Sequence, residues 1–232
     1  MSKTSFAASI PDGYPRFVDL RLLRYFVAGA SGTAVITVGT LADTAEQVGA
    51  GLVAAFRRRQ PHVDVVINES DLSDPTAGLR TGLVDVALTR TPFDGTGLST
   101  YVLGSDRIGV VMHDDDPLAG RRHVALAELA DRRWVQLPEG TDPLWRAYWT
   151  GARLRPDDDL PVMKTIQECL QSVLWNDTSA LAPVNQALPR GLVIVPVTDR
   201  DPSQLVVAWR GTAPTPLIRS FVEVASAHHA GH

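Results

Sequence analysis

The sequence has little cysteine, no long apolar run and no surplus of positive charge. Cys169 is the single cysteine in 232 residues, so no disulfide can form within the chain, and this composition suits a reducing compartment. No segment approaches the roughly 18 apolar residues that a membrane-spanning helix needs. The opening stretch MSKTSFAASIPDGYPRF also lacks the continuous apolar core of a secretory signal. We therefore expect a cytoplasmic protein that has no contact with a membrane.

The net charge and the length narrow the possible classes of protein further. The net charge is -4 at pH 7, so the overall balance does not indicate nucleic acid as a direct partner. Hydrophobic residues make up 44% of the chain, which is enough apolar material for one domain of ordinary size or for two small lobes. The composition is therefore that of a folded globular protein.

Motifs of catalysis and of metal binding are missing from the sequence. There is no G-x-S-x-G elbow, and Cys169 has no histidine close to it in sequence. The acidic runs 114–116 and 157–159 lie beside prolines, as is typical of solvated turns. The histidines show none of the spacings that a metal site requires: His62, His113, His123, His228, His229 and His232. We expect no enzymatic activity, no metal and no cofactor.

The sequence does contain an alternation of strand-like and helix-like segments. Five of them come in the order strand, helix, strand, helix, strand: 34–39, 43–59, 63–67, 73–82 and 84–89. Short loops between these segments predict right-handed crossovers and parallel strands, and such sheets bind ligands beyond the carboxyl ends of their strands. The predicted ends carry Thr40, Ser70 with Asp71, and Arg90 with Thr91.

A second alternation follows two further strands, which are predicted at 98–103 and 107–112. Its helices are predicted at 126–130, 143–151 and 167–175, with a helical turn at 184–188, and its strands at 134–137, 160–163, 180–181 and 192–195. A strand at 205–209 and a helix at 216–228 end the pattern. We predict an α/β fold of two Rossmann-like lobes, joined by crossing strands near 105–107 and 203–205.

Five stretches in order, within a span from Val35 to about Ala225, carry a family resemblance: ITVGTLAD, LVAAFRRRQPHVDVVINE, GLRTGLVDVALTRTP, RIGVVMHDDDPLAGRRHVALAELADRRWVQLP and VVAWRGTAPTPLIRSFVEV. Together they resemble the effector-binding domain of LysR-type transcriptional regulators, a member of the type 2 periplasmic-binding-protein fold. The resemblance implies a lobe I of 33–106 plus 205–232 and a lobe II of 107–204, with a small-molecule effector in the cleft between them. It also implies a homodimer, in which the predicted helix 43–59 and its neighbouring strand meet lobe II of the other subunit.

The first 32 residues form a separate arm in this interpretation. Within it, DLRLLRYFVA is similar to the start of the family's winged helix-turn-helix, but the continuation that would complete the DNA-reading unit is absent. A recognition helix needs its partner helix and turn to hold it in a groove. The resemblance therefore implies that this chain reaches DNA only through an intact regulator partner, or not at all.

The resemblance makes the polar residues at the strand ends candidate effector contacts. Thr40 precedes a predicted helix whose N-terminal N–H groups suit an anion, and Asp71 is placed to accept hydrogen bonds from an amine or hydroxyl. Residues of lobe II would form the opposite wall of the pocket. The full set is Thr40, Leu41, Ser70, Asp71, Arg90, Gln136, Leu137, Pro138, Thr165 and Thr178. For each of them the alternative is ordinary turn or capping chemistry.

Two further features concern the ligand. The stretch NDTSALAP stands where the family commonly has a glycine-containing turn, and it places Asp177 and Thr178 near the cleft. Trp145 and Trp149 share one helical face, and they either pack in a core or border a ligand. We expect a small polar or anionic effector.

Two other classes of protein would have the same fold. A stand-alone solute-binding or ligand-sequestering protein would bind its ligand without regulating a gene, and the lack of an export signal disfavours the transport version. An enzyme would need a reactive pair of side chains at the cleft, which the sequence does not show. The sequence therefore favours an effector-sensing domain.

Overall fold

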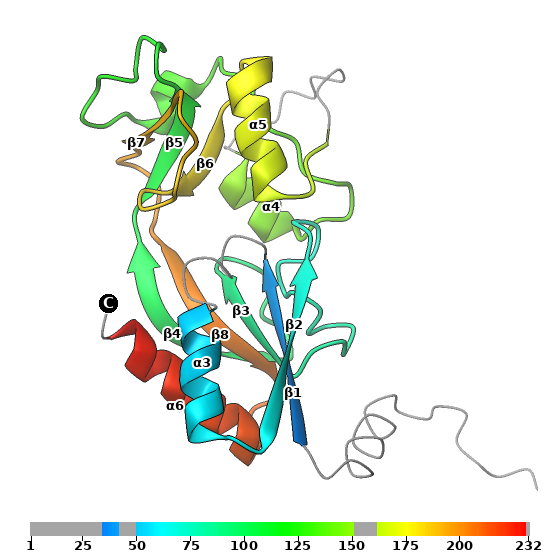
Figure 1. Ribbon diagram of the computed structural model, residues 1–232. Coiled ribbons are helices and arrows are strands. Elements are labelled where there is room, and N and C mark those ends of the chain that lie inside the picture. The colour runs from blue at the N-terminus through cyan, green and yellow to red at the C-terminus, as the bar shows by residue number, and fades with distance from the viewer. Residues whose placement is uncertain (1–33, 42–49, 151–161, 231–232) are drawn as a thin grey trace, which may run out of the picture.

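The computed structural model describes residues 34–41, 50–150 and 162–230, which form two β-sheets one above the other in Figure 1. The larger sheet has the strand order β2-β1-β3-β8-β4, and the smaller has the order β6-β5-β7. We call the described residues of 34–106 and 203–230 the five-stranded half, and those of 107–202 the three-stranded half. The strands of the larger sheet are β1 (Ala34–Leu41), β2 (Val63–Ser70), β3 (Val86–Arg90), β4 (Leu98–Asp106) and β8 (Ser203–Arg210).

Three strands of the larger sheet are parallel, so their carboxyl ends lie along the same edge. β1 lies between β2 and β3 and is parallel to both, as the alternating pattern of the sequence predicts. Thr40 is in register with Glu69 of β2 and with Leu88 of β3, so the three carboxyl ends lie along the same edge. That edge faces the three-stranded half in Figure 1. β8 and β4 complete the sheet in antiparallel pairing.

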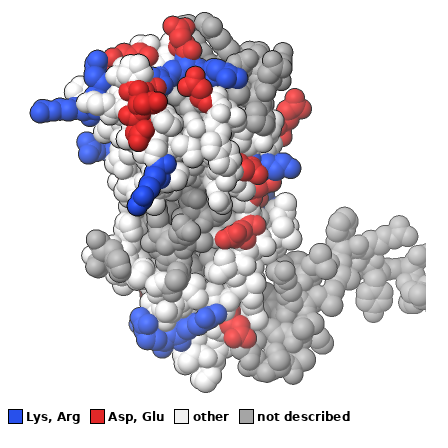
Figure 2. All heavy atoms as spheres, turned by 45° about the horizontal axis from the view of Figure 1, so that its top comes forward, with Lys and Arg blue, Asp and Glu red and all other residues white. Residues whose placement is uncertain are grey.

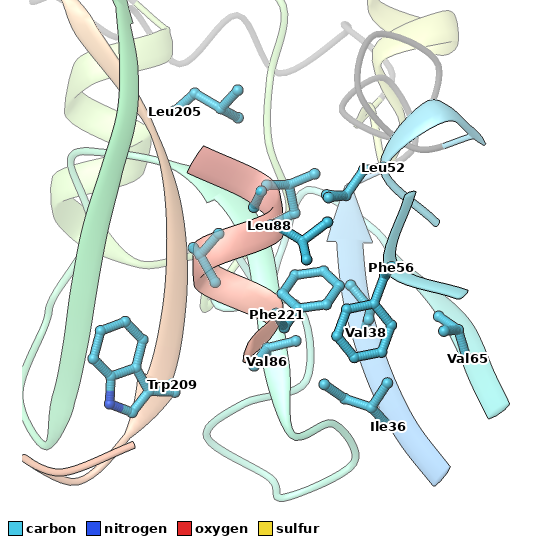
Figure 3. Packing of buried hydrophobic residues seen from close by; sticks show 13 residues of the cluster. Ile36, Val38, Leu52, Phe56, Val65, Val86, Leu88, Leu205, Trp209 and Phe221 are labelled. Atoms are coloured by element: carbon cyan, nitrogen blue, oxygen red, sulfur yellow. The ribbon is translucent and has the colours of Figure 1, made fainter. Parts of the chain in front are cut away.

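Two helices, α3 (Ala50–Arg59) and α6 (Pro216–His229), cover one face of the larger sheet (Figure 1). Phe56 of α3 and Phe221 of α6 are fully buried, with ring centroids 5.3 Å apart, and their rings meet above β1 in Figure 3. The Thr215 hydroxyl caps α6 by accepting the N–H of Ile218. Interlocking aromatic and β-branched side chains thus fill the core of this half. The first part of the predicted helix, 43–49, lies outside the described residues.

The three-stranded half is built around a central antiparallel strand. Its elements are β5 (Ile108–His113) between β6 (Ala180–Pro183) and β7 (Leu192–Pro196), the helices α4 (Pro143–Trp149) and α5 (Ile166–Asn176), and a 3-10 helix, η2 (Leu126–Leu129). The chain enters this half from β4 through Arg107 and returns from β7 to β8 through 197–202. These two crossings between two α/β units confirm the predicted fold class.

One predicted helix is wrong. Residues 73–82 form consecutive turns, because Ala77 and Gly78 have φ values of 49° and 87°, outside the right-handed helical region. The Asp74 carboxylate accepts the backbone N–H groups of Thr76 and Gly78, as the side chain of a turn residue commonly does. The turns lie directly on β1, since a Cβ on Gly39 would come 2.0 Å from the carbonyl oxygen of Ala77.

The predicted strands 134–137 and 160–163 are also wrong as regular strands. Only isolated bridges occur there, from Trp134 to Ser179 and from Gln136 to Val162, while 160 and 161 lie outside the described residues. The predicted helical turn at 184–188 is a turn at 184–185 followed by irregular chain. Across the parts of the chain that the structure describes, no helix is long and apolar enough to cross a membrane.

Candidate functional site: a cavity between the two sheets

A cavity of about 70 Å³ lies between the two sheets and extends into the three-stranded half. The carboxyl edge of the larger sheet supplies Leu41, Leu72 and Arg90 to its wall. The rest of the lining comes from the three-stranded half: Val111, Val135, Leu137, Trp145, Trp149, Thr150, Ile166, Cys169, Leu170, residues 180–183 and Gln186. A molecule in this cavity therefore contacts both halves of the protein.

The wall of the cavity is mostly apolar. Leu41 and Leu72 belong to the same buried cluster as Val111, Met163 and Val173, so the core of the three-stranded half continues across the gap between the sheets. The cavity is well below the roughly 300–1,000 Å³ of pockets for drug-sized ligands. It therefore suits a small molecule with a hydrocarbon surface.

Two tryptophans of α4 form one side of the cavity. Trp145 and Trp149 are four residues apart, as side chains on one helical face are, and their ring centroids are 5.3 Å apart. The Asp142 carboxylate positions the helix by accepting the N–H groups of Leu144 and Trp145, and Pro143 occupies the first helical position. The indole N–H groups of both tryptophans are buried, and neither has a hydrogen-bond partner among the residues that the structure describes.

The side chain of Arg90 is the only charged one in the described wall of the cavity. Its Nη1 lies 2.8 Å from Asp106 Oδ2, in an ion pair whose N–H is not aligned for a hydrogen bond. Asp106 Oδ1 in turn accepts the side-chain N–H of Asn185 at 3.1 Å. This chain of contacts joins the ends of β3 and β4 to the segment after β6, next to the point where the chain passes between the sheets.

Two hydrogen bonds also link the halves directly. The backbone N–H of Leu72 donates to the carbonyl of Lys164 at 2.7 Å, and the N–H of Asp94 donates to Asp142 Oδ2 at 2.8 Å. Asp142 therefore caps α4 and holds the loop after β3 at the same time. Any movement that widens the cavity by separating the halves has to break or rearrange these contacts.

Tyr148 lies behind the cavity wall and is not suited to acid–base chemistry at neutral pH. Its ring packs edge-on against Trp149 with centroids 4.9 Å apart, and the Arg200 guanidinium lies 5.0 Å from its centroid. Burial raises the pKa of Tyr148 to about 12. Its hydroxyl donates a hydrogen bond to the carbonyl of Asp201. The phenol is therefore a neutral packing group.

Three of the residues predicted from the sequence line the cavity: Leu41, Arg90 and Leu137. Thr40 is buried beside them, but its hydroxyl donates to the backbone carbonyl of Leu41 at 2.9 Å. Ser70 ends β2 outside the wall, and Asp71 Oδ1 accepts the N–H of Ser73 at 2.9 Å within a turn.

The predicted residues of the three-stranded half likewise serve local structure. The carbonyl of Gln136 accepts the N–H of Met163, and the carbonyl of Pro138 accepts the hydroxyl of Thr141. The Thr165 hydroxyl caps α5 by accepting the N–H of Glu168 at 3.1 Å. The Thr178 hydroxyl donates to Ser172 Oγ at 3.1 Å in a buried position. None of these four residues belongs to the described wall of the cavity.

Sequence reasoning missed the α5 and β6 parts of the wall. Ile166, Cys169 and Leu170 have the i, i+3, i+4 spacing of one apolar helical face, which is a detectable signal for burial. Ala180 and Ala182 of β6 are small, and their size leaves the space that the cavity occupies. The shared helical face of Trp145 and Trp149 does suggest a ligand border from the sequence, and both tryptophans line the cavity.

A family model matches most of the chain, and two curated regulators match parts of it. Residues 29–230 match the family described as the LysR substrate binding domain. An uncharacterised helix-turn-helix transcriptional regulator of Bacillus subtilis, YvbU, is 27% identical over 95 residues, which are 40% of this chain and 32% of that protein. A probable hydrogen peroxide-inducible genes activator of Mycobacterium avium is 27% identical over 120 residues, 50% of this chain and 39% of that protein. The chain thus matches between about a third and two fifths of the length of these curated relatives.

Solved structures show the same fold. The effector-binding domain of BenM with its effector benzoate superposes with a TM-score of 0.67 at 18% identity, covering 85% of this chain and 93% of that one. A C206 mutant of OxyR from Corynebacterium glutamicum gives a TM-score of 0.67 at 20% identity, covering 91% and 70%. On the strength of the family match over residues 29–230, the chain belongs to the LysR substrate binding domain family.

Proposed function

We propose that this chain senses a small-molecule effector bound in the cavity between the two sheets. The observation that carries the proposal is the composition of the wall, which takes Leu41, Leu72 and Arg90 from one half and the rest from the other. A ligand that touches both halves has different contacts when the halves move relative to each other, and this difference in affinity is what shifts a conformational equilibrium. In this proposal the moving units are lobe I, 33–106 plus 205–232, and lobe II, 107–204.

The chemistry of the wall favours a mainly apolar effector over the polar or anionic one expected from the sequence. The only charged side chain in the described wall, that of Arg90, is already paired with Asp106. A bare carboxylate entering such a site would lose its hydration without gaining an unpaired cation. The family is one of effector-binding domains of regulators rather than a family of enzymes, which supports binding without turnover.

Gene regulation by this chain is proposed to require an intact DNA-binding partner in the cytoplasm. On the face seen in Figure 2, basic and acidic side chains of the described residues are interspersed in the upper part of the view. A nucleic-acid-binding surface needs a stripe or patch of clustered basic side chains. The mixed charge of this upper part of the face therefore supports an indirect route to DNA.

A homodimer through α3 and β2 is the proposed assembly. β2 is an edge strand of the larger sheet, and its Val66 and Ile67 side chains are 48% and 43% exposed, while Trp175 of α5 is 70% exposed. Apolar groups left in water at an edge strand and on a helix are typical of surfaces that become buried on assembly. In sedimentation experiments, Ile67→Lys is expected to shift the protein towards monomer; an unchanged dimer would count against this interface.

A thermal-shift screen with small metabolites tests the sensing proposal. One-site binding stabilises the folded protein by RT ln(1 + [L]/Kd), about 2.7 kcal/mol at one hundred times Kd. Ala182→Leu, which places bulk in the cavity, should abolish the shift caused by any hit. Thr40→Val and Asp71→Ala serve as matched controls, because neither residue lines the cavity and both variants should keep the shift.

Two outcomes would contradict the cavity as the sensing site. A hit that still stabilises folded Ala182→Leu protein binds elsewhere. A hit that is lost in Thr40→Val and Asp71→Ala, but kept in Ala182→Leu, would return the site to the polar strand ends predicted from the sequence.

A further inference from the structure

One carboxylate holds segments of both halves at the same time. Asp142 Oδ1 caps α4 by accepting the N–H groups of Leu144 and Trp145 at 2.9 and 3.1 Å. Its Oδ2 accepts the N–H of Asp94, from the five-stranded half, at 2.8 Å. Each oxygen thus serves a different half. A hydrogen bond to an ionised group is roughly twice as strong as one between neutral groups, so this contact resists separation of the halves more than a neutral one would.

Both segments that this carboxylate joins are anchored in their own halves. On one side, Trp145 and Tyr148 of α4 are buried, the latter in an apolar cluster made of residues of the three-stranded half. On the other side, Phe93 is buried in a cluster of the five-stranded half, and the Asp94 carboxylate pairs with Arg80 at 3.1 Å. Because neither segment can follow the other without losing its own packing, the contact acts on the two halves and not only on a loop.

Two further hydrogen bonds between the halves lie next to the same cavity. One joins the N–H of Leu72, which lines the cavity, to the carbonyl of Lys164 at 2.7 Å. The other joins the Asn185 side chain to Asp106 at 3.1 Å, and the next residue, Gln186, lines the cavity. A separation that widens the cavity therefore has to break these contacts together with that of Asp142.

We propose that Asp142 is a latch, a contact that holds the halves together, and that its release lets the cavity widen. Asp142 does not line the cavity and acts through α4 and the loop after β3. The cavity of about 70 Å³ is smaller than pockets for drug-sized ligands, so an effector of that size enters only after the release. The inference rests on the proposed function in this last step, and it adds the residue that controls how often the cavity widens.

Hydrogen exchange of single backbone amides tests the latch without an effector, because an amide in a hydrogen bond exchanges when that bond opens. Asp142→Ser keeps one capping oxygen, and serine caps a helix as well as aspartate does, but the variant loses the second acceptor. The amide of Asp94 then exchanges faster in any case, so the decisive amide is that of Leu72. Its exchange should accelerate at least about tenfold, the effect of one lost hydrogen bond to a charged group. Two-dimensional NMR of the full ¹⁵N-labelled chain in deuterium oxide measures the rates.

Two amides and one variant are the controls. The amide of Trp145 should keep its rate, because serine retains the cap of α4. The amide of Val207, a fully buried residue of β8, reports global unfolding and should also keep its rate. Asp199→Ser is the matched variant, since Asp199 Oδ1 accepts the N–H of Leu126 at 2.8 Å within the three-stranded half. It should leave the exchange of Leu72 unchanged.

Three results would overturn the latch. Unchanged exchange at Leu72 in folded Asp142→Ser protein would mean that Asp142 fastens only a loop. Equal acceleration at Trp145 would mean that the variant acts by fraying α4. If the serine variant accelerates Val207, Asp142→Asn, which keeps the size of the side chain and one acceptor oxygen, repeats the measurement. Acceleration of Val207 in both variants would make Asp142 a residue of general stability.

The inference and the proposed function fail separately, because the exchange measurement needs no ligand and the thermal-shift screen does. Faster exchange at Leu72 with no hit in the screen would support the latch and count against the sensing proposal. A hit that Ala182→Leu abolishes, with unchanged exchange at Leu72 in Asp142→Ser, would support the cavity as the sensing site and overturn the latch.

Discussion

The cores of the two halves are both apolar, yet one is filled and the other is hollow. In the five-stranded half, Phe56 and Phe221 interlock with ring centroids 5.3 Å apart and leave no exposed surface on either side chain. In the three-stranded half, Trp145 and Trp149 are equally close, but Ala180 and Ala182 stand beside them and a cavity results. The size of side chains rather than their polarity separates the filled core from the core that contains the cavity in this protein.

Large-to-small substitutions should give the largest difference between the two cores in the free energy of unfolding that is lost. Phe221→Ala removes a fully buried ring from the filled core and is expected to lower the free energy of unfolding by about 3–5 kcal/mol. Leu170→Ala enlarges a space that already exists, at a half-buried position, so we expect a loss below about 2 kcal/mol. Urea unfolding followed by circular dichroism measures both values, and equal losses would mean that the two cores are packed alike.

Small-to-large substitutions should again destabilise the filled core more than the core with the cavity, but with a smaller effect. Ala225 of α6 is fully buried against the filled core, so Ala225→Leu is expected to destabilise the protein by about 1–3 kcal/mol through overpacking. Ala182→Leu places the same extra atoms into the cavity and should change the melting temperature little. A large fall in the melting temperature of Ala182→Leu would show that the cavity has no room for a side chain, and therefore none for a ligand of that size.

Much of the filled half could be predicted from the sequence, because its elements have strong local signals. The β-branched run of β1 and the spacing of Phe221 with Val224 on α6 identify a strand and an amphipathic helix without reference to the rest of the chain. The helix predicted at 73–82 failed for a reason that composition does not reveal. Ala77 adopts a positive φ that an alanine rarely has, and its carbonyl lies against Gly39, a contact with a different element that the local sequence does not show.

The candidate site was harder to predict, since capping residues and ligand contacts have the same composition. Thr165 and Asp71 are predicted effector contacts because they are polar residues at element ends, and in the structure both accept hydrogen bonds from nearby backbone N–H groups. The cavity depends instead on which apolar faces of α4, α5 and β6 meet. That meeting is a tertiary property, so only the pairing of Trp145 with Trp149 on one helix was visible in the sequence.

The two halves also differ in the burial of their ion pairs, and this contrast predicts a smaller effect on stability. Asp116 and Arg132 of the three-stranded half form a two-pronged pair with side chains 11% and 23% exposed, whereas Arg59 and Glu223 of the five-stranded half are 60% and 55% exposed. Arg132→Met should lower the free energy of unfolding by about 1.5 kcal/mol. Arg59→Met, the matched control, should lower it by less than about 1 kcal/mol, and a larger loss there than in Arg132→Met would reverse the contrast.

The buried pair should also make the stability of the protein sensitive to acid, which gives the last and smallest prediction. Hydrogen bonds from Arg132 lower the pKa of Asp116 below its ordinary value of 3.8, so the folded protein keeps this carboxylate ionised at a pH where the unfolded chain has protonated it. The stabilisation is complete above pH 3.8 and declines as the pH falls through the lower folded-state pKa. The difference in unfolding free energy between the wild-type protein and Arg132→Met should therefore be constant near neutral pH and shrink in acid. Urea titrations at neutral pH and at a series of acidic pH values measure it, with Arg59→Met as the control. A difference that stays constant throughout that range would mean that Asp116 is not held ionised by Arg132.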